Sequence, residues 1–157
     1  MCYFGYFYFM HQERYTVEIE ESATAYEFTS EGINGKVKKM VIYDRLKYDW
    51  IYNLAFGDKD EITGSIDDYK ITNNGDSKKV LATVACTLYT FTDKFPDAFI
   101  IALGNNKART RLYRMGICNN YDIIKNDFYV FGSLNDIWYP FEKNVDYEAF
   151  LVTRKKK

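Results

Sequence analysis

Residues 76–104, DSKKVLATVACTLYTFTDKFPDAFIIALG, contain a predicted helix followed directly by a predicted strand. Apolar residues recur in the first part at the spacing of one helical face; they are Val80, Leu81, Val84, Leu88 and Phe91. Asp76 or Ser77 caps the start of the helix, and Pro96 follows its end. Residues 97–104 are an apolar run of strand length, typical of a strand buried on both faces. We therefore expect a core-facing helix and then an interior strand.

The residues before this helix have the pattern of antiparallel strands, because apolar and polar side chains alternate along them. The expected strands cover residues 15–22, 25–32, 35–46 and 50–58. In the third strand we place the alternation around Val37, Met40 and Ile42. An acidic connection follows the fourth; it carries Asp58, Asp60, Glu61, Asp67 and Asp68. The first half of the chain is therefore expected to be mainly β.

A second helix is expected after the interior strand. It begins near Asn105 or Asn106, and either fades around Gly116 or continues unevenly to Lys125. Three more strands follow, at residues 127–134, 137–142 and 147–154. The order of strands, helix, strand, helix and strands predicts an α+β fold in which two helices pack on one face of a mainly antiparallel sheet. An aromatic content of 18% favours sheet as well.

With 157 residues, the chain has the length of one domain. We assign that domain to residues 13–154, between an aromatic N-terminal extension at 1–12 and a basic tail at 155–157. The extension has no basic n-region and about half the length of a membrane span, so we expect no signal peptide and no membrane partner.

Composition excludes several kinds of site. Cys2, Cys86 and Cys118 lack CxxC spacing, and His11 is the single histidine, so we expect no metal, no other cofactor and no histidine triad. The cysteine count fits a reducing cytoplasm better than a disulfide framework. The net charge of −1 provides no global field for nucleic acid, so any polyanion site must be local.

Such a local site is predicted where the second helix begins. The strand there is followed by Gly104, two asparagines and four cations; the polar residues are Asn105, Asn106, Lys107, Arg109, Arg111 and Arg114. A helix N-terminus already has partial positive charge, so cations in its first turn need a nearby anion. The turn is therefore a candidate anion site, although it lacks the spacing of a P-loop or a dinucleotide fingerprint.

The helical period divides these residues among faces. Ala108, Leu112 and Met115 share an apolar face that we expect to pack on the sheet. The cations take the two flanks: Lys107, Arg111 and Arg114 lie on one, and Arg109 lies with Tyr113 on the other.

Three sources could supply the negative charge: the protein's own acids in the 57–68 connection, a phosphate-bearing ligand or nucleic acid, or a partner protein. A secondary candidate site is the polar entrance to the first helix, where Asn73, Asn74 and Asp76 either cap the helix or contact a ligand. The acidic connection lacks the spacing of an EF-hand, so it is interpreted as a solvated turn.

Four runs resemble a family of uncharacterised small proteins from Bacteroidota, catalogued only as a domain of unknown function. The runs are YNLAFGD, NNGDSKKVLATVACTLYTFTDKFPDA, ARTRLYRMGI and YEAFLV. The similarity extends from about Tyr26 to Arg154. It implies a stand-alone bacterial cytoplasmic domain and provides no activity or catalytic residues.

Two functions remain open. The first is a protein that recognises phosphate or nucleic acid, with a metal-independent ribonuclease of the toxin type as its enzymatic form. Arg111 and Arg114 would stabilise the phosphorane charge, Lys107 would neutralise the backbone, and Tyr113 would stack or transfer a proton. The second is a non-enzymatic interaction module that binds a partner protein or self-associates. Whether the chain is an enzyme is left open.

Overall fold

A computed structural model describes residues 13–67 and 70–156. The expected extension at 1–12, with Cys2 and His11, lies outside the described residues, as do Asp68 and Lys157. The described elements are β1 (Glu18–Ile19), β2 (Ala25–Gly32), β3 (Gly35–Arg45), β4 (Ile51–Asp58), α2 (Ser77–Lys94), β5 (Phe99–Ala102), α3 (Lys107–Asp127), β6 (Phe128–Leu134), β7 (Ile137–Pro140) and β8 (Ala149–Arg154). The α+β fold predicted from the sequence is confirmed.

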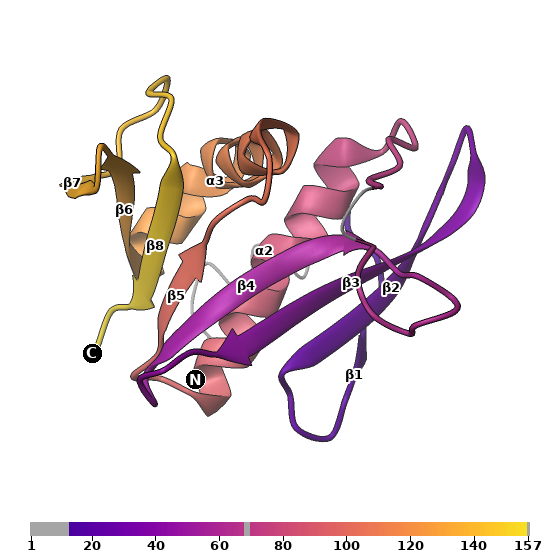
Figure 1. The fold of residues 1–157 in the computed structure, drawn as a ribbon, viewed down its shortest axis with the longest axis horizontal. Helices are drawn as coiled ribbons and strands as arrows, with labels where there is room; N and C mark the ends of the chain where they lie inside the picture. Colours follow the sequence, from indigo (N-terminus) through magenta and orange to yellow (C-terminus); the bar gives the residue numbers. More distant parts are fainter. Residues whose placement is uncertain (1–12, 68–69, 157) are drawn as a thin grey trace.

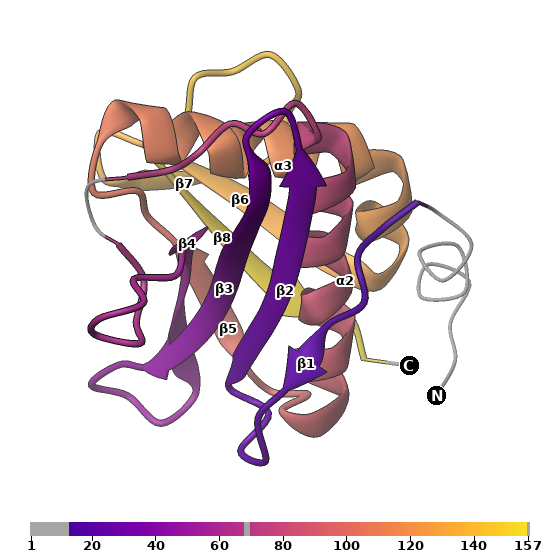
Figure 2. The same cartoon turned by 90° about the vertical axis from the view of Figure 1, so that its right-hand side faces the viewer.

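The strands form one eight-stranded sheet in the order β1-β2-β3-β4-β5-β8-β6-β7. Neighbouring strands are antiparallel except β4 and β5, which are parallel. A parallel pair needs a crossover, and α2 supplies it. In the view of Figure 1 both helices lie behind the sheet, as expected, and Figure 2 shows the arrangement from the β1 edge.

In β3 the side chains that face the helices are one residue away from the expected Met40 and Ile42. Val41 pairs with Phe56 of β4, and both are buried on the helix side. Met40 and Ile42 point to the other side of the sheet, because successive side chains of a strand alternate between faces. The sequence grouping of Val37 with Met40 and Ile42 therefore combined residues from opposite faces. Lys39 shares the helix side with Val41 and is also buried.

The strand β5 is interior in the sheet but is covered on one face. Ile100 is buried beneath the helices, whereas Phe99 is 40% exposed on the opposite face. The expectation of burial on both faces is wrong because both helices pack on the same side. We call the side of β4, β5, β8 and β6 that turns away from the helices the open face; it is toward the viewer in Figure 1.

The core lies between the sheet and α2 and is rich in aromatic rings. Phe91 of α2 stacks on Tyr43 of β3 with ring centroids 4.1 Å apart, and Tyr52 of β4 meets Phe91 edge-on at 4.9 Å. Such ring pairs are favourable beyond the area that they bury. Cys86 of α2 belongs to the same core. The predicted core-facing helix is thus confirmed.

Burial raises the pKa of the Cys86 thiol, because the thiolate is poorly solvated in the core. Native protein in which Cys2 and Cys118 are replaced by serine should therefore react with a thiol reagent at pH 8 at least about a hundredfold more slowly than unfolded protein. Labelling followed by mass spectrometry measures both rates. Equal rates in the two states would show that Cys86 is not buried.

Candidate functional site

A cleft of about 400 Å³ opens between the start of α2 and the first half of α3. We call it the interhelical cleft. Its apolar lining consists of Phe56, Ile71, Val80, Leu81, Leu112 and Met115. Its remaining lining is Lys39, Thr72, Asn73, Asn74, Asp76, Ser77, Ala108 and Arg111. The structure thus brings the secondary candidate residues at the entrance of α2 into one cavity with Arg111 of α3.

The first turn of α2 has no side-chain cap. Asp76 occupies the N-cap position but makes no capping hydrogen bond. Its Oδ2 instead accepts hydrogen bonds from the Tyr15 hydroxyl and from Ser30 Oγ, each at 2.5 Å. Burial and the hydrogen bond to Asp76 raise the pKa of Tyr15. The first N–H groups of α2, at exposed Ser77 and Lys78, are therefore left without a side-chain acceptor from the N-cap.

The two asparagines before α2 hold the chain in place. Asn74 is buried; its amide donates to Ser30 Oγ at 3.0 Å and to the Gly35 carbonyl at 2.9 Å, and its Oδ1 accepts from Asn34 N–H at 2.6 Å. Asn73 is exposed, and its Oδ1 accepts from Gly75 N–H at 3.1 Å. The side chain of Asn74 therefore has a structural role, and Asn73 faces solvent at the cleft.

A buried ion pair lies beside the cleft, and its Lys39 is part of the cleft lining. Lys39 Nζ contacts Asp58 Oδ1 and donates to the Thr72 carbonyl at 2.8 Å. The second carboxylate oxygen of Asp58 accepts from Thr72 N–H at 2.8 Å. These bonds satisfy both charges inside the protein, so Lys39 lines the cleft without offering a free cation to a ligand.

At the start of α3, the two asparagines have separate positions. Asn106 is the N-cap, and its Oδ1 accepts from Arg109 N–H at 2.9 Å. Asn105 lines a different hollow on the other side of the sheet, together with Asp44 and Asn53. Neither asparagine lines the interhelical cleft.

Arg109 is one of the residues that fasten α3 to the sheet. It is 5% exposed, and its guanidinium donates to the carbonyls of Phe56 at 2.9 Å and of Asp67 at 2.6 Å. A Cβ at Gly57 would lie 2.8 Å from Arg109 Nη1, so glycine leaves the space that the guanidinium occupies. The charge of Arg109 thus meets one backbone carbonyl of β4, at Phe56, and one of the acidic connection, at Asp67.

Tyr113 is buried one turn further along α3, and its hydroxyl accepts from Phe56 N–H at 3.3 Å. Burial raises its pKa. Ala108 is exposed. The packing face of α3 is therefore centred on Arg109 and Tyr113. The expected packing face, centred on Ala108, Leu112 and Met115, is wrong because the buried positions lie one residue further along the helix. Two polar groups can occupy the buried face because the end of β4 supplies their hydrogen-bonding partners.

The remaining cations stay near the surface. Arg114 forms an ion pair with Asp146, which lies outside the acidic connection. Lys107 is exposed and lines a shallow groove with Arg111 and Arg114. Arg111 is exposed and lines both this groove and the interhelical cleft. Of the basic residues predicted to bind anions, Arg111 is therefore the one that faces the cleft.

Sequence reasoning missed Tyr15, Ser30 and Lys39. Lys39 had a usable signal, because it alternates in phase with Val41 and Tyr43 and so belongs to the buried face. Tyr15 and Ser30 are 61 and 46 residues away from Asp76 in the sequence, so no local pattern could predict their contacts with it.

The described residues offer neither a metal site nor a membrane-crossing helix. No group of three or more histidine, cysteine or acidic side chains is placed to hold a metal ion. Of the described helices, neither combines the length and the apolar composition of a membrane-crossing segment.

The chain belongs to a family of unknown function, DUF6934, which matches residues 11–155. No curated protein and no solved structure matches the chain. The family extends across the cleft and both helices, so the site described here lies within the shared domain.

Alanine variants of Arg109 and Arg111 test which of the two arginines in the basic turn is buried. Arg109→Ala should lower the free energy of unfolding by about 2–4 kcal/mol, because it leaves two carbonyls without their donor and opens a cavity. Arg111→Ala should change it by less than about 0.5 kcal/mol, as surface substitutions do. Urea denaturation measures both values. Similar small effects for the two variants would place Arg109 at the surface.

Proposed function

We propose that the protein binds the phosphate group of a nucleotide, or of the end of an RNA strand, in the interhelical cleft. The observation that carries the proposal is the convergence of two anion-attracting features on one cavity. The first turn of α2 is uncapped because Asp76 turns to Tyr15 and Ser30, and exposed Arg111 reaches the same cleft from α3. N–H groups at a helix start and a guanidinium are the donors that phosphate prefers.

The rest of the cleft suits the base and sugar of a nucleotide. Its apolar lining provides a surface for a base or sugar, and its volume of about 400 Å³ lies in the range of small-molecule sites. The net charge of −1 and the internal pairing of Lys39 support recognition of one phosphate group over a long polyanion.

The proposal is for recognition and not for cleavage. A ribonuclease of the expected type would use Tyr113 to stack on a base or transfer a proton, and Tyr113 is buried with a raised pKa. The free thiols of Cys86 and Cys118 fit a reducing compartment such as the bacterial cytoplasm.

Isothermal titration with inorganic phosphate, adenosine 5′-monophosphate and a short 5′-phosphorylated RNA, each at two salt concentrations, tests this function. We expect Arg111→Ala to weaken binding of the monophosphate about tenfold or more, since it removes a charged hydrogen-bond donor. Arg114→Ala is the control: it changes a neighbouring arginine that pairs with Asp146 outside the cleft, so binding should stay within about twofold.

The double variant Arg111→Ala, Arg114→Ala should remain folded, because neither residue belongs to the buried face of α3. Circular dichroism and thermal melting check this control. Wild-type protein that binds none of the three probes, or an Arg111→Ala variant that binds as wild type does, would refute the proposed site.

A further inference from the structure

A second hollow, of about 550 Å³, lies on the open face where the parallel strands β4 and β5 separate. β5 pairs with β4 from Ile51 to Asn53 and ends at Ala102, whereas β4 continues to Asp58. The acidic connection after β4 and the chain that leads from β5 into α3 complete its walls. We call it the open-face hollow. Open sheets commonly bind ligands beyond the carboxyl ends of their parallel strands.

Arg109 and Tyr113 reach this hollow from the buried face of α3. Among the described strands, none pairs with β4 on this side once β5 has ended. The two side chains bond the backbone of Phe56 in place of a strand, because its N–H donates to the Tyr113 hydroxyl at 3.3 Å and its carbonyl accepts from Arg109 Nη1 at 2.9 Å. Both side chains therefore fill the gap between β4 and α3.

The guanidinium of Arg109 extends through this gap to the open face. Phe56 points to the helix side, so a Cβ on the next residue, Gly57, would point to the open face. That Cβ would lie 2.8 Å from Arg109 Nη1 and 3.4 Å from its Cζ. Arg109 Nη2 donates to the carbonyl of Asp67, which also lines the hollow. The charged end of Arg109 thus lies at the inner end of the open-face hollow.

Two donors at this inner end have no acceptor among the described residues. Arg109 Nε is buried and has no hydrogen-bond partner. The Tyr113 hydroxyl accepts from Phe56 N–H but donates to no described residue, and it keeps its proton because burial raises its pKa. A buried donor without an acceptor is costly and rare in native proteins. These two donors therefore point to an acceptor from outside the chain.

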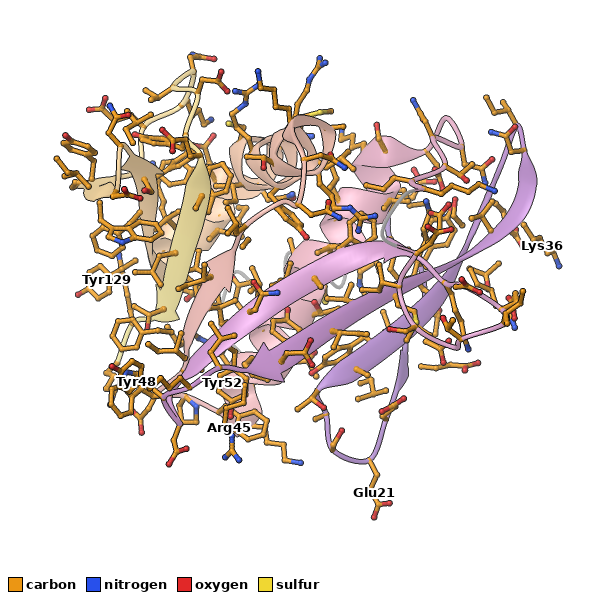
Figure 3. All side chains as sticks on the ribbon, in the orientation of Figure 1. Glu21, Lys36, Arg45, Tyr48, Tyr52 and Tyr129 are labelled. Atoms are coloured by element: carbon orange, nitrogen blue, oxygen red, sulfur yellow. The ribbon has the colours of Figure 1, made fainter. Side chains whose placement is uncertain are left out.

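The outer end of the hollow has acceptors instead. Asp44 and Asn53 are directly paired across β3 and β4, and neither side chain forms a hydrogen bond or an ion pair with a described residue. Apolar Ile42 and Ala55, which are also directly paired, lie between the two ends. Figure 3 views the sheet from the open face and labels Arg45, the residue after Asp44, near this outer end.

We propose that the open-face hollow binds a neutral saccharide, with a disaccharide as the size that spans it. Donors at one end and a carboxylate at the other need a ligand that both accepts and donates, and hydroxyl groups do both. The ends are separated by the rise of β4 from Asn53 to Gly57, about 13 Å, which suits a ligand longer than a single sugar ring. Ile42 and Ala55 provide an apolar surface for the C–H groups of a ring.

The charges of the hollow favour a neutral ligand over an anion or a cation. Its described lining carries three carboxylates, Asp44, Asp60 and Asp67, which repel a phosphate or carboxylate ligand. The guanidinium of Arg109 at the inner end repels a cation. The open-face hollow and the interhelical cleft share no lining residue and lie on opposite sides of the sheet, so this proposal is independent of the phosphate site.

An array of neutral mono- and disaccharides, probed with the full chain, tests the proposal, and isothermal titration then measures the affinity of the best binder. We expect Asp44→Ala to weaken that binding about tenfold or more, because it removes the carboxylate that accepts from a sugar hydroxyl. Asp49→Ala is the matched control, since Asp49 is an exposed aspartate that does not line the hollow. The control, and Arg111→Ala in the cleft, should bind within about twofold of the wild type.

Two further measurements locate the ligand. Ala55→Leu should weaken binding at least about tenfold because the larger side chain fills the hollow, and thermal melting checks that this variant is folded. In the proton–nitrogen NMR spectrum of the wild type, the Arg109 Nε–H signal should shift when the saccharide is added. A wild-type protein that binds no saccharide of the array overturns the proposal. Binding that leaves the Arg109 Nε–H signal in place, or that Asp44→Ala does not weaken, overturns the assigned site.

Discussion

The buried ion pair between Lys39 and Asp58 determines where the chain leaves the sheet. It joins the middle of β3 to the end of β4, and through Thr72 it holds the segment that leads into α2. Because both charges are buried, removal of either one would leave the other uncompensated, so the pair acts as a unit. Together with the hydrogen bonds of Asn74 and Asp76 to Ser30, this pair holds the start of α2 and one wall of the interhelical cleft in place.

The basic turn of α3 illustrates how one local sequence serves three purposes. Arg109 points inward to the carbonyls of Phe56 and Asp67, Arg111 faces the cleft, and Arg114 reaches Asp146. A rotation of 100° per residue separates neighbours that are adjacent in the sequence. The positive charge that is concentrated along the chain is therefore dispersed in space, which fits a protein with one local anion site better than a broad polyanion surface.

The cleft and the exposed rings on the opposite side of the sheet both follow from the packing of the two helices on one side. Their N-terminal halves enclose the cleft on that side, and the opposite side of β5 and its neighbours is left with Phe99 and Tyr129 exposed.

The class of fold could be predicted from the sequence alone, because the apolar spacing of Val80 to Phe91 and the apolar run at 97–104 are local signals that follow from helix and strand geometry. The sequence also located the polar entrances of both helices. Which side of each element is buried depends on long-range packing and could not be predicted in the same way. Met40 and Val41 are both buried, so apolar character alone could not tell which of them faces the helices, and helical spacing could not show that Arg109 would find carbonyl partners at Phe56 and Asp67. The face that a strand or helix buries depends on contacts with residues distant in the chain, and those contacts exist only once the sheet has assembled.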